Sequence, residues 1–204
     1  MSENESTKPA LFGVIPLDVA IPVLISLLSI MTAFAAYRAA VVDSASFDRY
    51  FEAQSALNTS NSLYIEANQN VIQDTAMYDN FRSNEFTGNK RLATYYFDLF
   101  SDELMAAYER DEAAFDDIYY EEIYKSAEDA LSESDILFKK ASHDSDRAVS
   151  YQLTVLIMAV GLSFAAWASL SGQDQRMRTL FASLSITSFL IGFTQMLTIP
   201  GALG

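Results

Sequence analysis

The chain has 204 residues, half of them hydrophobic, yet its formal net charge is −14 and its mean hydropathy is slightly positive. These values coexist only if apolar and charged residues are segregated: residues 43–149 hold 23 acidic and 9 basic residues, and the rest of the chain holds four of each. This partition excludes an ordinary soluble globular protein, and the acidity argues against a nucleic-acid-binding protein, which needs a basic surface. Because the chain has no cysteine, a disulfide scaffold and a thiolate metal site are also excluded.

The first predicted element is a membrane-spanning helix over residues 17–42, which follows a polar leader at 1–16. No residue from 19 to 37 is charged, and a helix needs about 20 apolar residues to cross the hydrocarbon core of a bilayer. A cleaved signal peptide is the alternative, because the residues 33–35 (AFA) have the form of a cleavage site. The leader, however, is not positively charged and the apolar run is long, so we expect an uncleaved anchor.

The acidic segment 43–147 is predicted to be a helical extramembrane domain. Gly88 is the only glycine or proline in it, which disfavours a sheet with many turns. Apolar residues recur every seven positions, as in a helix that packs lengthwise on another helix. The repeating residues are Tyr50, Leu57, Tyr64, Val71 and Tyr78, with Ala53, Ser60 and Ala67 three positions further on. We expect the first helix to continue without a break to about residue 82.

A turn is predicted at residues 83–89 (SNEFTGN), because Gly88 and Asn89 tolerate positive φ. A second helix should follow over about 90–110, and a third helix should begin after a loose acidic stretch at 109–117. The third helix carries a stripe of apolar or small residues at helical spacing. Members of this stripe are Tyr120, Ile123, Ala127, Ser134, Leu137 and Ala141. We expect the first and third helices to run antiparallel as a coiled-coil-like stalk, with the second completing a bundle.

Two further membrane-spanning helices are predicted at 148–171 and 179–199, joined by a short basic loop at 172–178 and followed by a tail at 200–204. Their uncharged runs are continuous rather than alternating, which favours helices over barrel strands. Buried helices of a soluble core are the alternative, but a chain of this length could not cover three fully apolar helices. The predicted fold class is therefore an all-α membrane protein with three transmembrane helices.

Orientation depends on a few charged residues. Arg176 and Arg178 outnumber Asp174 in the short loop, and basic residues in short loops stay in the cytoplasm. This places the N-terminus in the cytoplasm and the acidic domain outside it, in what we expect to be a prokaryotic plasma membrane. Other basic residues flank the acidic domain and favour the opposite orientation. They are Arg38, Arg49, Lys139, Lys140 and Arg147.

The densest acidic run, residues 109–122, contains the candidates for a weak cation site: Asp116, Asp117 and Glu121. Carboxylates suit Ca²⁺ or Mg²⁺, but the run lacks the glycine that an EF-hand loop needs at its bend. A solvated acidic face is the favoured interpretation, so no metal and no cofactor are expected. The single histidine, His143, has no second histidine or cysteine to complete a site. With no catalytic constellation in the sequence, we do not expect an enzyme.

Small or polar residues recur four positions apart in the predicted spans, which permits close helix contact in lipid. They are Ser29, Ala33, Gly161, Ala165, Ser169, Ser188 and Gly192, and Gln195 extends the last pair. Packing among the spans or between subunits is the favoured interpretation. A polar pore or substrate path is the alternative.

The layout resembles an uncharacterised family of small prokaryotic membrane proteins. The matching segments are FAAYRAAVVDSASFDRY after the first span, the run from EEIYKSAEDAL to GLSFAAWASL, and RMRTLFASLSITSFLIGFTQMLTIP. The resemblance implies one N-terminal span, a helical insert and a closing pair of spans joined by a basic loop. It implies no activity and no functional residue.

Three functions follow as hypotheses. The first is a non-enzymatic protein of the lipid bilayer that acts by assembly, either as a homo-oligomer or as an accessory subunit of a larger membrane complex. The second is a cation channel or cation-handling protein with an acidic vestibule, because such a surface raises the local concentration of cations. The third is an enzyme or the input domain of a sensor. No nucleic-acid partner is expected.

Overall fold

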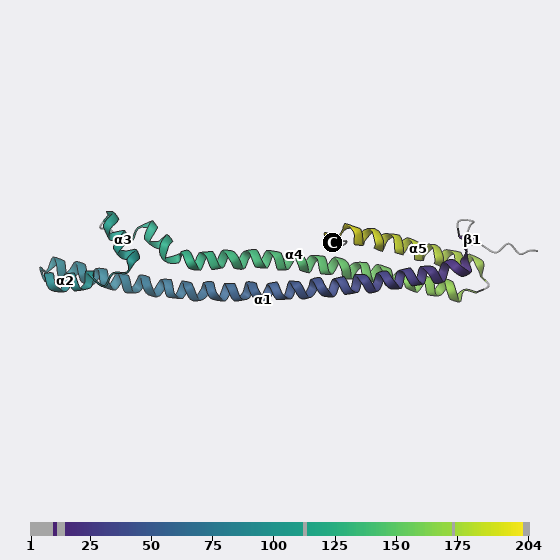
Figure 1. The fold of residues 1–204 in the computed structure, drawn as a ribbon, viewed down its shortest axis with the longest axis horizontal. Helices are drawn as coiled ribbons and strands as arrows, with labels where there is room; N and C mark the ends of the chain where they lie inside the picture. The colour runs from purple at the N-terminus through teal and green to yellow at the C-terminus, as the bar shows by residue number, and fades with distance from the viewer. Residues whose placement is uncertain (1–9, 12–14, 112–113, 173, 202–204) are drawn as a thin grey trace, which may run out of the picture. The chain divides into compact units, whose positions relative to one another are not determined.

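The fold is described by a computed structural model for residues 10–11, 15–111, 114–172 and 174–201 (Figure 1). The regular secondary structure of the described residues consists of helices and two paired strands of two residues each, β1 and β2. The bounds of these elements are β1 Ala10–Leu11, β2 Ile15–Pro16, α1 Leu17–Phe86, α2 Lys90–Phe97, α3 Asp102–Asp111, α4 Asp117–Leu170 and α5 Gln175–Thr198. Helices α1, α4 and α5 are each long and apolar enough to cross a membrane. The prediction of an all-helical chain with three such helices is confirmed.

The chain divides into two compact units, and both α1 and α4 contribute to each. Unit 1 comprises Met1–Phe47 and Ala141–Gly204, and therefore the start of α1, the end of α4 and all of α5. Unit 2 comprises Asp48–Lys140, and therefore the rest of α1 and α4 together with α2 and α3. The acidic segment predicted from the sequence, residues 43–147, contains all of unit 2 and extends beyond it by a few residues at each end.

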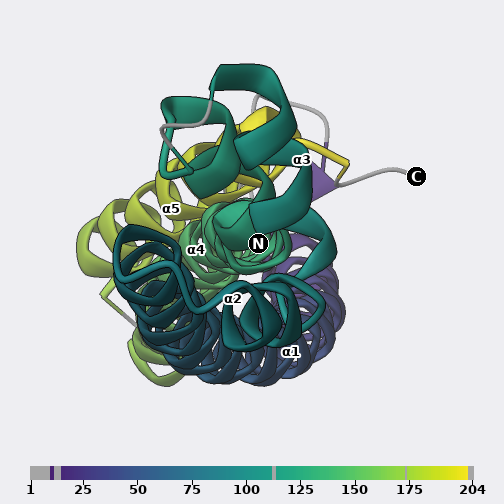
Figure 2. The ribbon, with the colours of Figure 1, turned by 90° about the vertical axis from the view of Figure 1, so that its left-hand side faces the viewer.

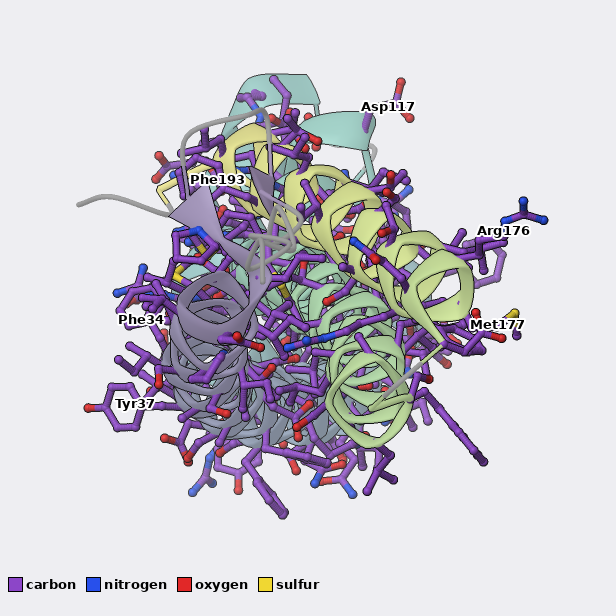
Figure 3. The ribbon with its side chains drawn as sticks, turned by 90° about the vertical axis from the view of Figure 1, so that its right-hand side faces the viewer. Phe34, Tyr37, Asp117, Arg176, Met177 and Phe193 are labelled. Atoms are coloured by element: carbon purple, nitrogen blue, oxygen red, sulfur yellow. The ribbon has the colours of Figure 1, made fainter. Side chains whose placement is uncertain are left out.

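Unit 1 is held together by three small clusters of buried residues from α1, α4 and α5. Around its middle, Leu28, Met158 and Ala165 are fully buried. Most other large apolar side chains of these helices face outward, and Phe34 and Tyr37 of α1 can be followed pointing away from the other helices in Figure 3. Outward-facing apolar side chains are what a helix in lipid requires, because lipid tails are as apolar as leucine.

Glycines allow α4 and α5 to approach closely in unit 1. A Cβ added to Gly161 would lie 3.0 Å from the Cβ of Ser188 and 3.1 Å from Leu28 Cδ2, and one added to Gly192 would lie 2.9 Å from Met158 Cε. The Ser185 hydroxyl uses this proximity and donates a hydrogen bond of 2.8 Å to the carbonyl of Gly161. Small residues and a hydroxyl therefore join these two helices.

Serine hydroxyls also join α1 to α4. In unit 2, Ser60 donates to the carbonyl of Ala127 at 2.8 Å, and Ser134 donates in the opposite direction to the carbonyl of Ala53 at 3.0 Å. In unit 1, Ser46 donates to the carbonyl of Ala141 at 2.8 Å. All of these serines and alanines are buried. A hydroxyl reaches a carbonyl of the opposite backbone only where the helices lie close, which small side chains permit.

The prediction of one helix over residues 90–110 is wrong, because this segment forms two helices, α2 and α3. Figure 2 views both helices from their end of unit 2. Helix α2 ends at Phe97, and Ser101 starts α3 because its Oγ accepts the backbone N–H of Leu104 at 3.0 Å. The apolar spacing across both helices imitates one continuous helix. A side-chain cap is what interrupts it.

The remaining boundaries differ by short segments. Helix α1 is continuous from Leu17, as predicted, and extends past residue 82 to Phe86, before Gly88 adopts a φ of +75°. The loop after α4 is shorter than predicted, because Asp174 caps α5 by accepting the N–H groups of Arg176 and Met177. Arg176 and Arg178 therefore lie in the first turns of α5.

Candidate functional site

The predicted cation-site residues lie where α4 begins, and one of them is already engaged. Asp116 receives two hydrogen bonds of 2.8 Å from the guanidinium of Arg110, and it caps α4 by accepting the N–H of Tyr119 at 2.7 Å. The bond from Arg110 first, and then that from Tyr119, lower the pKa of Asp116 to about 2. The same pairing raises the pKa of Arg110. Asp116 thus serves as a helix cap and ion-pair partner.

Asp117 and Glu121 are exposed on the first turns of α4. Within the described ranges, no group of three or more His, Asp or Glu side chains could hold a metal ion. The structure therefore does not bring the three candidates together as a ligand set.

A buried carboxylate that the sequence analysis did not single out lies elsewhere in unit 2. Asp74 of α1 is 2% exposed, and its Oδ2 accepts one hydrogen bond from Ser101 at 2.6 Å and another from Tyr119 at 2.8 Å. Burial, followed by the bond to Asp74, raises the pKa of Tyr119 well above the usual range of a phenol. Asp74 thereby links the start of α3 to the start of α4.

A signal for Asp74 was present in the sequence. It continues the seven-residue series of Ala53, Ser60 and Ala67, whose members are all buried. A charged residue at such a position requires polar partners, because an unpaired buried charge is very costly.

Aromatic rings surround this network. Tyr78, Phe81, Phe100 and Tyr108 contact one another with ring centroids 5.6–6.5 Å apart, which is the distance range of favourable ring pairs. Phe97 and Phe115 extend the group. At the start of α4 the ring that is buried is Tyr119, whereas Tyr120, which the predicted stripe included, is 41% exposed. The network and the rings together form a structural core of unit 2.

The predicted membrane-packing residues fall into two groups. Gly161, Ala165 and Gly192 are buried between the helices of unit 1, and Ser188 and Gln195 are half-buried. Ser29, Ala33 and Ser169 are exposed and do not pack between the described helices; their packing between subunits, the other part of the prediction, stays a prediction. Their four-residue spacing is compatible with a lipid-facing side, and burial instead falls on Leu28, Ala35 and Ala168.

The polar side chains of α5 mostly bond to backbone. Thr179, Thr187 and Thr194 each donate to the carbonyl four residues earlier in their own helix. Ser185 alone among them bridges to α4, at Gly161. These bonds satisfy hydroxyls in an apolar environment.

An exposed apolar stripe follows α1 in unit 2. We use this name for Phe51, Ile65, Ile72 and Phe86, which are 74%, 60%, 70% and 94% exposed. They are separated by multiples of seven residues, so they share one heptad position, at which Asn58 and Asp79 also stand. Isolated exposed apolar residues are normal, but a heptad series of them fits a further helix.

Comparison with known protein families, curated proteins and solved structures finds no match to this chain.

Proposed function

We propose that the protein is an integral, multi-pass protein of a prokaryotic plasma membrane, with its N-terminus in the cytoplasm and unit 2 outside it. Helices α1, α4 and α5 supply three candidate spans, and Arg176 and Arg178 supply the cytoplasmic charge between the last two. A reporter fused after Gly204 should be active only outside the cytoplasm. A cytoplasmic signal would contradict the orientation, and recovery of full-length protein without detergent would contradict the membrane placement.

We further propose that unit 2 is a coiled-coil-like helical bundle in water. Support comes from the serine–carbonyl bonds between α1 and α4 and from ring contacts such as Tyr64–Tyr124, at 5.7 Å. The acidic surface favours water over lipid, because charged residues in the hydrocarbon core are expensive.

Within this setting we propose that the protein acts by assembly with further copies of itself, without catalysis. The exposed apolar stripe carries the proposal, since its seven-residue spacing suits a helix laid lengthwise and every copy of the chain supplies such helices. The net charge of −14 opposes the contact between copies. We therefore expect assembly to strengthen as salt screens that repulsion.

The absence of cysteine allows a clean test by single-cysteine crosslinking in membranes. Ile72→Cys should form a disulfide-linked dimer, whereas Gln73→Cys should not, because consecutive residues point about 100° apart around a helix. Both positions are exposed and adjacent, so the two cysteines match in solvent exposure and in their position along α1. Equal crosslinking of both, or of neither, would contradict assembly through the stripe.

A charge-insertion pair completes the test. The double variant Ile65→Glu/Ile72→Glu should shift the protein toward the monomer in detergent. The control Asn70→Asp/Gln73→Glu adds the same two negative charges at exposed positions outside the stripe and should assemble much more strongly than the double variant. If the double variant assembled normally, a role as accessory subunit to a different protein would take precedence.

A further inference from the structure

Two arginines meet at one end of unit 1, where α1 and α4 approach the residues that follow α5. Arg38 of α1 donates a hydrogen bond of 2.7 Å to the carbonyl of Gly201, and its Cζ lies 5.9 Å from the ring centre of Tyr151. Nη2 of Arg147 in α4 also borders Gly201, 3.0 Å from where a Cβ would stand. Two guanidinium groups therefore converge on one residue.

Among the described residues, the ion pairs of these two arginines involve one carboxylate. Asp144 is 3.2 Å from Arg147 Nη1, and Arg38 has no ion-pair partner within the described chain. Each guanidinium has five N–H donors, and most of these are not used by the bonds to Gly201 and Asp144. The group therefore has surplus hydrogen-bond donors.

Three polar atoms in this group are buried without a hydrogen-bond partner in the part of the chain that is described: Nε of Arg38, Nε of Arg147 and the hydroxyl of Tyr151. Tyr151 itself is 0% exposed. Long side chains on a helix lean toward its N-terminus, which directs the Tyr151 hydroxyl toward the turn that holds Arg147. Nε of Arg178, whose guanidinium pairs with Asp18, is unpaired as well, so the fully buried Tyr151 hydroxyl is the atom that distinguishes this group. A buried polar atom left unpaired is rare in proteins and indicates a missing partner.

The depth of the group in the proposed membrane identifies the acceptor. At the opposite end of unit 1, Arg178 pairs with Asp18 at 2.7 Å. Asp18 and Arg38 lie on one helix, and the 20 residues between them correspond to about 30 Å, the thickness of the hydrocarbon core. With the Asp18 pair at one face of the bilayer, Arg38 reaches the phosphate layer of the other.

We propose that Arg38, Arg147 and Tyr151 form a binding site for the phosphate of an anionic membrane lipid. Guanidinium groups bind phosphate oxygens through paired, charge-assisted hydrogen bonds, and basic pockets between transmembrane helices bind lipid head groups. The half-buried arginines present N–H groups to the lipid phosphate, and the Tyr151 hydroxyl donates a further bond from beneath. The inference rests on the proposed membrane placement and is independent of assembly.

The experiment measures lipid retention by full-length protein in neutral detergent, using native mass spectrometry during titration with phosphatidylglycerol. The wild type should bind one lipid at this site, and Arg38→Gln and Arg147→Gln should each weaken that binding about tenfold or more. Arg176→Gln, which removes an exposed arginine from the other end of the spans, should bind as the wild type does. Wild-type binding by both site variants would overturn the proposal.

Two further measurements complete the test. The first separates loss of lipid binding from loss of folding, and the second separates a lipid phosphate from free inorganic phosphate. The melting temperature without lipid should be similar for the wild type and for Arg38→Gln, and the rise on adding phosphatidylglycerol should be smaller in the variant; an equal rise would overturn the proposal. Dioleoylglycerol, which lacks phosphate, should not bind. Displacement of the lipid by millimolar inorganic phosphate would assign the site to a free anion and overturn the lipid source. Protein that is soluble without detergent would refute the membrane placement, a result distinct from failure of lipid binding.

Discussion

Units 1 and 2 use the same two long helices but stabilise them differently. In unit 1 most buried positions are small or aliphatic, although Tyr151 and Asp144 are buried as well. The close contacts there involve Gly161, Gly192 and two bridging hydroxyls, those of Ser46 and Ser185. In unit 2 the contacts involve aromatic rings around a buried carboxylate, Asp74, in addition to serine–carbonyl bonds. Water drives the burial of large rings, whereas lipid gives no such advantage and favours close backbone packing.

The largest effect should come from removing the buried carboxylate of unit 2. Asp74→Ala leaves the hydroxyls of Ser101 and Tyr119 without their acceptor, which should destabilise unit 2 by about 2–4 kcal/mol. Hydrogen–deuterium exchange on full-length protein should show that α2 and α3 exchange faster in the variant than in the wild type, whereas α5 exchanges at the same rate in both. Asp79→Ala, at an exposed position of the same helix, should have little effect. Unchanged exchange in Asp74→Ala would show that the network does not stabilise this unit.

The next effect should fall in unit 1. Gly161→Val must displace the Cβ of Ser188, which is fixed to the α5 backbone, and should destabilise the packing of α4 and α5 by about 1–3 kcal/mol. Gly192→Ala should cost less, because the atom it meets is the flexible end of Met158. Thermal melting in detergent measures both. If Gly192→Ala were the more damaging change, this account of close packing would be wrong.

A smaller effect is expected from the serine–carbonyl hydrogen bonds between α1 and α4 in unit 2, a type of bond that unit 1 also contains. Ser60→Ala and Ser134→Ala each remove one bond to a backbone carbonyl but keep the small volume, so each should cost about 0.5–1.5 kcal/mol. Ser62→Ala, on the exposed face of α1, is the matched control. Chemical denaturation followed by circular dichroism gives the comparison, and equal stability of all three variants would count against a role for the interhelical bonds.

The smallest effect concerns pH. Asp116 is ionised and paired with Arg110 in the folded protein, and its lowered pKa means that its contribution to stability is present above pH about 4. The contribution should be lost as the pH falls from about 4 to about 2, because the carboxyl then gains a proton. NMR titration of the Asp116 carboxyl carbon should show a midpoint near 2. A midpoint at the ordinary value would mean that the ion pair is absent in solution.

Much of the fold could be predicted from the sequence because its strongest signals are long and repetitive. The uncharged runs predict α1, α4 and α5, and the seven-residue series predicts that α1 continues beyond its first span. The break between α2 and α3 could not be predicted, since it depends on how Ser101 bonds to Leu104 and to Asp74, which is distant in sequence. Local spacing contains no information about such a partner.

The candidate sites were harder to predict for the same reason. Four-residue spacing identified Gly161 and Gly192 but also Ser29 and Ala33, because spacing defines a face without stating what covers it. Among the acidic residues, density pointed to the segment around Asp116, whereas the buried carboxylates of the described chain are Asp74 and Asp144. Burial depends on the neighbouring helix rather than on local composition.

The division between the units falls inside helices, after Phe47 in α1 and after Lys140 in α4, and not in linkers. Proteases cut most readily at exposed, irregular segments, and neither junction offers one. Excising the acidic half would also leave two severed helix ends, each with backbone groups that have lost their intrahelical partners. Shedding of unit 2 as a free fragment is therefore disfavoured, and a recombinant version of it would need new caps at both cuts.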